Sequence, residues 1–449
     1  MKRFKNAAQM LCIMFLAVFF LTGCVAPQEP PNEEPPEQTD EKTEYVLQFE
    51  EQEYILVTGE SKDLSITFTA DGAAADTSLL KFTSSDKNVV TVQNGTLTAV
   101  SAGNAVVTVE AEEKSARANV TVVADATAEQ VNGFGEEYIN IYGRSYIADG
   151  KLNLDQSANA VEVGIAGGGL SVEISATAPG YLRVWVDGVE AAERISISAG
   201  SAEYTVAEEL PQGFHKIRLV KATEMQNACW DILSFEAEKF VCVPEKSDLK
   251  IEIVGDSISA GYGVLGTMGE SWSVSNSDCT RSYAYVAADK LNADYSIVAW
   301  SGICTKAYHW ASNINMADLY KRVSFTNTAE YAFDFSPDVV VINLGTNEAS
   351  YLSKNAAYAQ QFPSDYKDFL TYVREKNPDA YIICLYGMMG INTTIDNGIA
   401  TACEQMNDAK IVYNPFIIVS NTSAANGHPS AVAQTEWGRQ LSEYILGIL

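Results

Sequence analysis

Residues that bind metals or carry positive charge are scarce in this sequence. Only three histidines occur among 449 residues, and none of the eight cysteines has the C-x-x-C spacing. Because zinc sites need closely spaced cysteine and histidine ligands, no metal site is expected, and no motif implies a cofactor. Lys and Arg number 30 against 58 Asp and Glu, a formal net charge of −28. This balance argues against nucleic acid and anionic lipid headgroups as partners and suits a neutral substrate.

An apolar segment at the N-terminus has the features of an export signal. Three basic residues precede an apolar stretch over 10–20, which is short for a membrane span. The tetrapeptide Leu-Thr-Gly-Cys that ends at Cys24 matches a bacterial lipobox. Residues 1–23 are therefore expected to be a signal peptide, and Cys24 the acylated first residue of the mature protein. Val25 is not the Asp that retains lipoproteins at an inner membrane, so we expect a lipid-anchored protein of the bacterial cell envelope, exposed at its surface.

Two segments without catalytic motifs follow this cysteine. Residues 24–44 hold five of the 13 prolines together with six glutamates, which predicts an extended, self-repelling tether. Residues 45–124 are expected to form short alternating strands around an Asn94-Gly95 hairpin turn. The stretch from Ser84 to Gly103 resembles the bacterial Ig-like group 2 modules, which implies an Ig-like β-sandwich. Because aromatic residues do not cluster there, we expect a spacer, with carbohydrate or adhesin binding as the alternative.

The region 246–449 alternates strand-like and helix-like segments. The predicted strands lie near 250–255, 295–301, 338–344, 380–386 and 410–414, and the helical patterns cover 282–292, 364–376 and 430–449. Alternation at this spacing predicts a parallel sheet with helices on both faces. Open sheets of this kind bind ligands at the carboxyl ends of their strands.

Four short motifs occur at predicted strand ends or in the last loop. They are Gly255-Asp256-Ser257, Ser301-Gly302, Gly345-Thr346-Asn347 and Asn426-Gly427-His428. Their order resembles that of the SGNH hydrolases over residues 246–449, which implies a flavodoxin-like α/β fold. The resemblance further implies that Ser257 is the nucleophile. The N–H groups of Ser257 and Gly302 and the side-chain amide of Asn347 would form the oxyanion hole.

His428 is the expected general base. A serine hydroxyl is a weak nucleophile at neutral pH and needs a base within hydrogen-bond reach. His215 falls in a strand-like stretch of the preceding region and His309 in a helical or loop stretch, so His428 is the best placed of the three. Most SGNH hydrolases carry an Asp shortly before this histidine, but residues 425–427 include no carboxylate. In a serine protease the orienting Asp is worth about 10⁴ in turnover. Either the site is inactive, or a backbone carbonyl orients the imidazole in a Ser-His dyad, and we expect the dyad.

Residues 130–245 are expected to form a β-rich domain. Their alternation has period two, as in the run Leu182, Val184 and Val186. Together with the opening Tyr142-Gly143-Arg144, this region resembles the jelly-roll module that precedes the hydrolase domain in carbohydrate esterase family 2. Enzymes of that family remove O-acetyl groups from plant polysaccharides and are described as using a Ser-His dyad.

The expected protein is a multidomain, surface-anchored serine esterase that removes O-acetyl groups from polysaccharides of the xylan or glucomannan type. Tyr262 and Trp310 lie near the motif ends and are candidates for stacking on a sugar ring, although large aromatic residues belong more often to the core. Peptidoglycan O-acetyl groups and short-chain lipid esters stay open as substrates, because the motifs encode the chemistry and not the acyl acceptor. A protein of another class, a catalytically weak carbohydrate-binding lipoprotein, would fit if the missing Asp marked lost activity.

Overall fold

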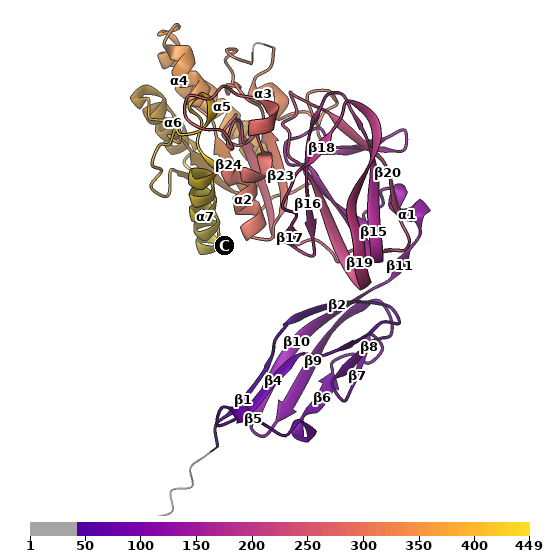
Figure 1. Ribbon diagram of the computed structural model, residues 1–449. Coiled ribbons are helices and arrows are strands. Elements are labelled where there is room, and N and C mark those ends of the chain that lie inside the picture. Colours follow the sequence, from indigo (N-terminus) through magenta and orange to yellow (C-terminus); the bar gives the residue numbers. More distant parts are fainter. Residues whose placement is uncertain (1–42, 312) are drawn as a thin grey trace, which may run out of the picture. The chain divides into compact units, whose positions relative to one another are not determined.

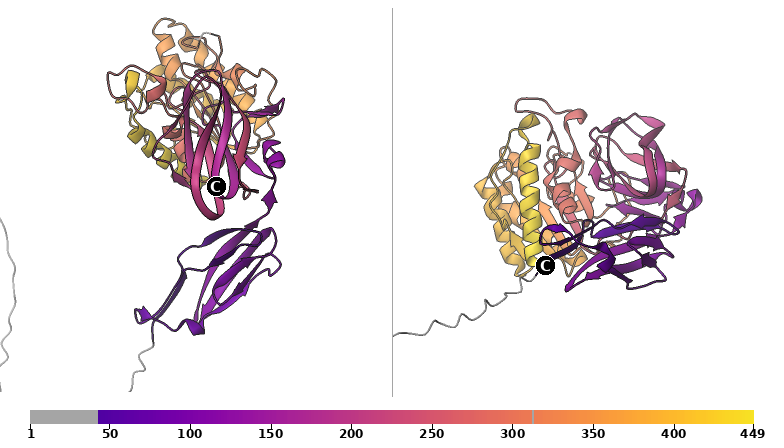
Figure 2. Two further views of the ribbon diagram at one scale, coloured as in Figure 1. Left: turned by 45° about the vertical axis from the view of Figure 1, so that its right-hand side comes forward. Right: turned by 60° about the horizontal axis from the view of Figure 1, so that its bottom comes forward.

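The computed structural model describes residues 43–311 and 313–449. The predicted signal peptide, Cys24 and most of the predicted tether lie outside the described residues. From Tyr45 onward, two strand-rich regions are followed by an α/β region, as Figures 1 and 2 show. None of the helices in the described ranges is long and apolar enough to cross a membrane.

The first strand-rich region consists of three small sheets. Its elements are β1 (Tyr45–Phe49), β2 (Glu53–Val57), β3 (Ser61–Asp63), β4 (Ile66–Ala70), β5 (Ala73–Ala74), the 3-10 turn η1 (Thr77–Leu79), β6 (Lys81–Ser84), β7 (Val90–Gln93), β8 (Thr96–Ala99), β9 (Gly103–Ala111) and β10 (Lys114–Val123). The sheets have the orders β1-β4-β5, β2-β10-β9-β6 and β3-β8-β7. Alternate residues such as Val107 and Val120 face a common core. Asn94 and Gly95 have φ of 51° and 85°, the backbone that a two-residue hairpin between β7 and β8 requires.

The second strand-rich region is an 11-stranded sheet built around two long strands. Its elements are β11 (Asp125–Ala126), α1 (Ala128–Asn132), β12 (Ile139–Tyr142), β13 (Tyr146–Ala148), β14 (Lys151–Asn153), β15 (Ala160–Ala176), β16 (Gly180–Val186), β17 (Val189–Glu190), β18 (Ile195–Ile197), β19 (Gly200–Lys221), β20 (Trp230–Ala237) and β21 (Phe240–Val241). The register between β15 and β19 shifts on both sides of Gly168, and such bulges bend a strand. The bent sheet surrounds an apolar core that includes Val163, Ile174 and Leu219.

The C-terminal region is a five-stranded sheet with helices on both faces. Its elements are β22 (Lys250–Gly255), η2 (Val274–Asn276), η3 (Cys279–Arg281), α2 (Tyr283–Lys290), β23 (Asp294–Ala299), α3 (Met316–Leu319), β24 (Val339–Asn343), α4 (Thr346–Leu352), α5 (Tyr358–Lys376), β25 (Tyr381–Leu385), α6 (Thr393–Met406), β26 (Ile411–Tyr413), η4 (Ala425–Gly427) and α7 (Ala431–Ile448). The strand order is β23-β22-β24-β25-β26, and every pairing is parallel. Helices α2 and α7 cover one face and α5 and α6 the other. The prediction of a multidomain chain that ends in a parallel-sheet α/β domain is confirmed.

Helix α5 begins earlier than the sequence pattern predicts. The predicted start was residue 364, directly after a proline, whereas the helix starts at Tyr358 and contains Pro363. A proline inside a helix removes one backbone hydrogen bond. Phe362, next to it, is fully buried in the core shared with α6, and this packing offsets the lost bond. The boundary prediction was wrong because tertiary packing outweighed the local helix breaker.

A buried ion pair joins the second strand-rich region to β22. Arg144 Nη2 lies 2.9 Å from Glu252 Oε1, and both side chains are almost completely buried. Arg144 also donates to the carbonyl oxygen of Tyr320 at 2.6 Å. The Tyr320 hydroxyl donates to Glu252 at 2.5 Å, so the carboxylate has donors on both oxygens. Removing one partner of such a pair leaves an uncompensated charge in a low-dielectric interior.

Replacing Arg144 by Ala should lower the free energy of unfolding by about 3–5 kcal/mol, because Glu252 would stay buried without its partner. The matched control is Arg439→Ala, since Arg439 pairs with Glu436 and Glu443 on the exposed side of α7, and exposed pairs contribute little. Urea unfolding followed by tryptophan fluorescence compares the two variants. Equal urea midpoints would contradict the assignment of Arg144 as a main link between the regions.

Candidate active site

The sequence motifs meet at one edge of the parallel sheet. Ser257 follows the end of β22, Gly302 follows β23, and Asn347 lies in the first turn of α4, directly after β24. Because β22 pairs with β23 on one side and with β24 on the other, these strand ends are neighbours. The chain reverses its direction of travel across the sheet at this point, which is where open α/β sheets bind ligands. His428 reaches the same edge from the loop between η4 and α7.

Ser257 and His428 form a direct hydrogen-bonded pair. His428 Nε2 lies 2.9 Å from Ser257 Oγ. With its proton on Nδ1, the imidazole accepts the serine proton at Nε2. The Tyr262 ring packs against the imidazole with 4.3 Å between the ring centroids, and Asn426 Nδ2 donates to the Tyr262 hydroxyl at 3.1 Å. Ring packing and the serine contact together restrict the orientation of the imidazole.

The environment of His428 favours its neutral form. Desolvation by burial lowers the pKa of His428 to about 4, against the opposing effect of the backbone carbonyls of Asn426 and Ala425. These carbonyls lie close to the ring, although Nδ1 makes no hydrogen bond of standard geometry with the described residues. The imidazole is therefore uncharged at pH 7, the state that a general base needs.

The residues expected to form the oxyanion hole lie after the neighbouring strands β22, β23 and β24. Gly302 has φ 83°, and a Cβ there would lie 2.6 Å from Trp310 Cβ, so glycine is needed at this turn. Asn347 Nδ2 donates to the carbonyl oxygen of Ile303 at 2.9 Å and to Asp256 Oδ2 at 3.3 Å. The amide of Asn347 is thus fixed to the loop that carries Gly302, and its longer bond goes to a side chain.

Two buried acids, Asp256 and Glu348, are the chain neighbours of Ser257 and Asn347. Asp256 accepts the N–H of Ile258 at 3.0 Å and so shapes the turn around the serine. Desolvation raises the pKa of Asp256 to about 7, and the nearby Glu348 adds to the effect. Glu348 accepts the N–H of Thr305 at 2.5 Å, and burial raises its pKa as well. Raised pKa values reduce the negative charge close to the expected oxyanion.

The aromatic candidates differ in their exposure. Tyr262 is half-buried between His428 and Trp272, with 5.4 Å between the Tyr262 and Trp272 ring centroids. Trp310 is 67% exposed and packs on His309 beside the Gly302 turn. Aromatic side chains beside convergent polar groups are typical of ligand sites.

Two contacts at the site have no signal in the sequence. Ser301 Oγ donates to Glu224 Oε2 at 2.6 Å, although Glu224 belongs to the second strand-rich region. Asn421 Oδ1 accepts the N–H of Ser430 at 3.2 Å and so holds the loop around His428. Neither Glu224 nor Asn421 lies in a recognisable motif. The contact between Ser301 and Glu224 joins residues 77 positions apart, so it leaves no local pattern in the sequence.

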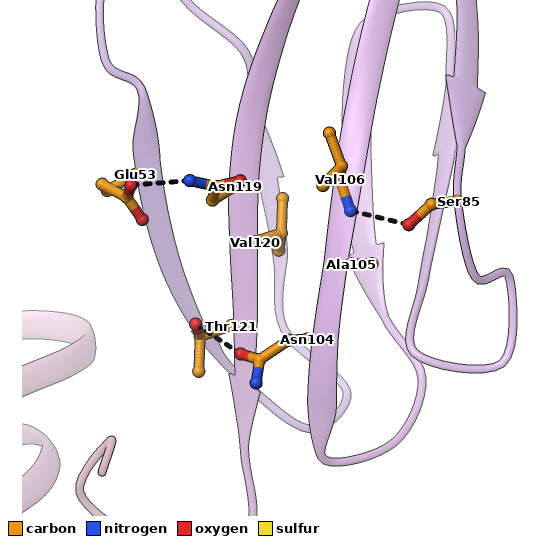
Figure 3. A pocket seen from close by; sticks show the side chains of 8 residues that line it. All are labelled: Glu53, Ser85, Asn104, Ala105, Val106, Asn119, Val120 and Thr121. Atoms are coloured by element: carbon orange, nitrogen blue, oxygen red, sulfur yellow. Dashed lines mark hydrogen bonds between the residues drawn. The ribbon is translucent and has the colours of Figure 1, made fainter. Parts of the chain in front are cut away.

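A separate hollow of about 360 Å³ lies on the first strand-rich region (Figure 3). Its polar side chains pair with one another: Asn119 Nδ2 donates to Glu53 at 2.8 Å, and Thr121 Oγ1 donates to Asn104 at 2.9 Å. The eight residues drawn in Figure 3 include no aromatic side chain. This surface therefore offers a ligand no aromatic stacking face, and several of its polar atoms are already hydrogen-bonded within it.

The geometry at the sheet edge is that of an SGNH-type serine hydrolase. A serine follows the first parallel strand and a neutral histidine contacts its hydroxyl, while Gly302 follows β23 and Asn347 lies in the first turn of α4. Such a site can attack an ester carbonyl and stabilise the resulting oxyanion. Within the described ranges, no group of three or more His, Cys, Asp and Glu residues could hold a metal ion.

Comparison with known proteins shows which serine hydrolases this chain is similar to. Residues 253–414 match the GDSL-like Lipase/Acylhydrolase family, and residues 141–244 match the Carbohydrate esterase 2 N-terminal family. The chain is 31% identical over 271 residues to a cellulase/esterase of Acetivibrio thermocellus, which covers 58% of this chain and 33% of that protein. It is 28% identical over 205 residues to an acetylxylan esterase / glucomannan deacetylase of Cellvibrio japonicus, which covers 41% of this chain and 56% of that one.

A solved structure agrees with both matches. It is that of a family two carbohydrate esterase from Clostridium thermocellum in complex with cellohexaose, with a TM-score of 0.63 and 29% identity over 69% of this chain and 100% of that chain. The chain is therefore homologous to the family 2 carbohydrate esterases, which are carboxylic ester hydrolases of the SGNH/GDSL type. These homologues are esterases, the class of enzyme that the sequence motifs predict for this chain. The chain spans a third to about half of the length of the two curated relatives.

The lowered pKa of His428 can be measured directly, because the chain has only three histidines. We expect its ring resonances to titrate near pH 4, well below the ordinary 6.5, since desolvation penalises the charged form. NMR titration of ring protons measures this, and the spectrum of His428→Ala assigns the signal. A His428 titration between pH 6 and 7 would contradict the buried, neutral imidazole.

Proposed function

We propose that this protein is a serine esterase that removes O-acetyl groups from polysaccharides through a Ser257–His428 dyad. The observation that carries the proposal is the 2.9 Å contact between His428 Nε2 and Ser257 Oγ, made at the strand edge where Gly302 and Asn347 also lie. The homology to family 2 carbohydrate esterases supports it.

The reaction proceeds in two acyl transfers. Ser257 Oγ attacks the acetyl carbonyl carbon while its proton passes to His428 Nε2. The N–H groups of Ser257 and Gly302 and the Asn347 amide donate to the oxyanion, for which Asn347 gives up its longer bond to Asp256. The intermediate collapses to acetyl-Ser257, and the sugar hydroxyl leaves with the proton from His428. Water then attacks the acetyl group, loses a proton to His428 and releases acetate, and Ser257 regains its proton.

In this mechanism nearby backbone carbonyls supply part of the electrostatic role of the missing carboxylate, and Tyr262 packing helps to orient the imidazole. The carbonyls of Asn426 and Ala425 favour a protonated ring, which is the part that an orienting Asp plays in a triad. A carbonyl carries no full charge, so the dyad does not bury another carboxylate. The same lack of charge makes the His428 imidazole a weaker base than it would be beside an Asp.

Replacing Ser257 or His428 by Ala should lower kcat/KM for p-nitrophenyl acetate at least about a hundredfold, because each variant loses the nucleophile or its base. The assay uses the mature chain with Cys24→Ala, so that no lipid is attached. If the parent turns over and both variants fail, the dyad is supported. If all three are folded and equally inactive, the dyad is contradicted, and the catalytically weak carbohydrate-binding protein becomes the better reading.

An acetylated plant polysaccharide is the proposed substrate. One curated relative is an acetylxylan esterase / glucomannan deacetylase. The formal charge of −28 on this protein suits an uncharged polysaccharide as substrate. Tyr262 and Trp310 are the proposed stacking residues for the sugar rings. Peptidoglycan O-acetyl groups are the alternative acyl donor, which the acetate released from each polymer would distinguish.

Trp310→Ala should raise KM for acetylated xylan more than KM for p-nitrophenyl acetate, because only the polymer has sugar rings to stack. Loss of about 1 kcal/mol of stacking corresponds to roughly fivefold in KM. Initial rates over a range of both substrates measure the difference. An equal change in the two KM values would contradict a sugar contact by Trp310.

Envelope anchoring through Cys24 completes the proposal. In this view the tether gives reach, the Ig-like module is a spacer, and the jelly-roll module is part of the esterase. Parent protein should sediment with membranes and incorporate radiolabelled palmitate, whereas Cys24→Ala should do neither, since the thiol is the site of acylation. Unchanged fractionation and labelling of Cys24→Ala would contradict the anchor.

A further inference from the structure

A buried acid of the second strand-rich region touches the loop that carries Gly302. Glu224 lies in the loop between β19 and β20 and is 2% exposed. Its Oε2 accepts the hydroxyl of Ser301 at 2.6 Å. Its Oε1 is buried without a hydrogen-bond partner among the described residues. Burying a carboxyl group costs free energy unless it is hydrogen-bonded. The bond to Ser301 therefore offsets part of the cost of burying Glu224.

Other residues of the β19–β20 loop also contact the α/β region. Met225 is buried in one apolar cluster with Trp300 and Ile303, the residues on either side of the Ser301-Gly302 pair. The N–H of Cys279 donates to the carbonyl oxygen of Ala222 at 2.9 Å. The β19–β20 loop therefore contacts the Gly302 loop through a hydrogen bond and through apolar packing.

We propose that Glu224 is a positioning residue that fixes the Gly302 N–H for the oxyanion, so that the second strand-rich region completes the active site. The inference rests on the proposed esterase function. Gly302 has φ 83° and lies against Trp310. Ser301, directly before it, is the residue whose hydroxyl donates to Glu224. An oxyanion donor acts only when it is held in place before the reaction, and small displacements cost rate.

The effect of Glu224 should appear in turnover and not in substrate binding. Glu224→Ala and Ser301→Ala should each lower kcat for p-nitrophenyl acetate by about ten- to a hundredfold with KM within about twofold, because the donor acts in the transition state. The double variant should be no worse than the weaker single one, since both remove the same contact. Glu224→Gln keeps an oxygen acceptor for Ser301 and should retain kcat within about threefold.

The matched control is Glu190→Ala. Glu190 also belongs to the second strand-rich region and also contacts the α/β region, but its partners are Arg183 and Arg281. Additive losses in the double variant, or a kcat of Glu224→Ala equal to that of Glu190→Ala, would overturn the inference.

Hydrogen exchange tests the same contact without any activity. Amide exchange of the peptide that spans residues 299–305, followed by mass spectrometry, should be faster in Glu224→Ala and Ser301→Ala than in Glu190→Ala or the parent. Unchanged exchange would overturn the positioning role. If exchange changes while the parent itself has no esterase activity, the positioning stands and the proposed function fails.

Discussion

The parallel pairing of β22 with a neighbour on each side is the constraint on which the rest of this structure depends. Because β23 and β24 flank β22 in the same direction, the residues after all three strands converge without any long-range adjustment. The serine, the glycine turn and the asparagine come from these three ends. The helices on both faces then bury the strands, and the last helix leaves His428 in the loop before it, opposite Ser257.

The second strand-rich region holds this strand and its surroundings at more than one point. Arg144 pairs with Glu252 in the middle of β22, where a charged residue in a buried strand would otherwise be costly. Arg183 Nη2 lies 2.9 Å from the fully buried Asp278 ahead of α2. Glu224 contacts Ser301 at the carboxyl edge. These contacts are polar and buried, and buried polar groups are stable only when their partners are in place. They therefore favour one arrangement of the second strand-rich region against the α/β region.

The sequence predicts the elements that depend on local patterns. Apolar runs followed by short motifs marked the five strands of the α/β region, and the scarcity of histidine singled out His428. Local patterns could not predict that Asn347 donates to both Ile303 and Asp256, or that Arg144 and Glu224 reach across to other regions, because such contacts join residues far apart in the chain. The prediction of where α5 begins failed for a related reason. The sequence shows Pro363 as a helix breaker but does not show that Phe362 packs in the core. The predicted roles of Ser257, Gly302, Asn347 and His428 stay predictions that chemistry must test.

The most direct test of the account is covalent labelling of the proposed nucleophile. The mature protein would be treated with diethyl p-nitrophenyl phosphate, which transfers a diethylphosphoryl group to an activated serine, and analysed by intact mass and peptide mapping. We expect one added group per chain, located on Ser257, and strongly slowed labelling in His428→Ala. Labelling at another residue, or equal rates with and without the His428 imidazole, would contradict the dyad.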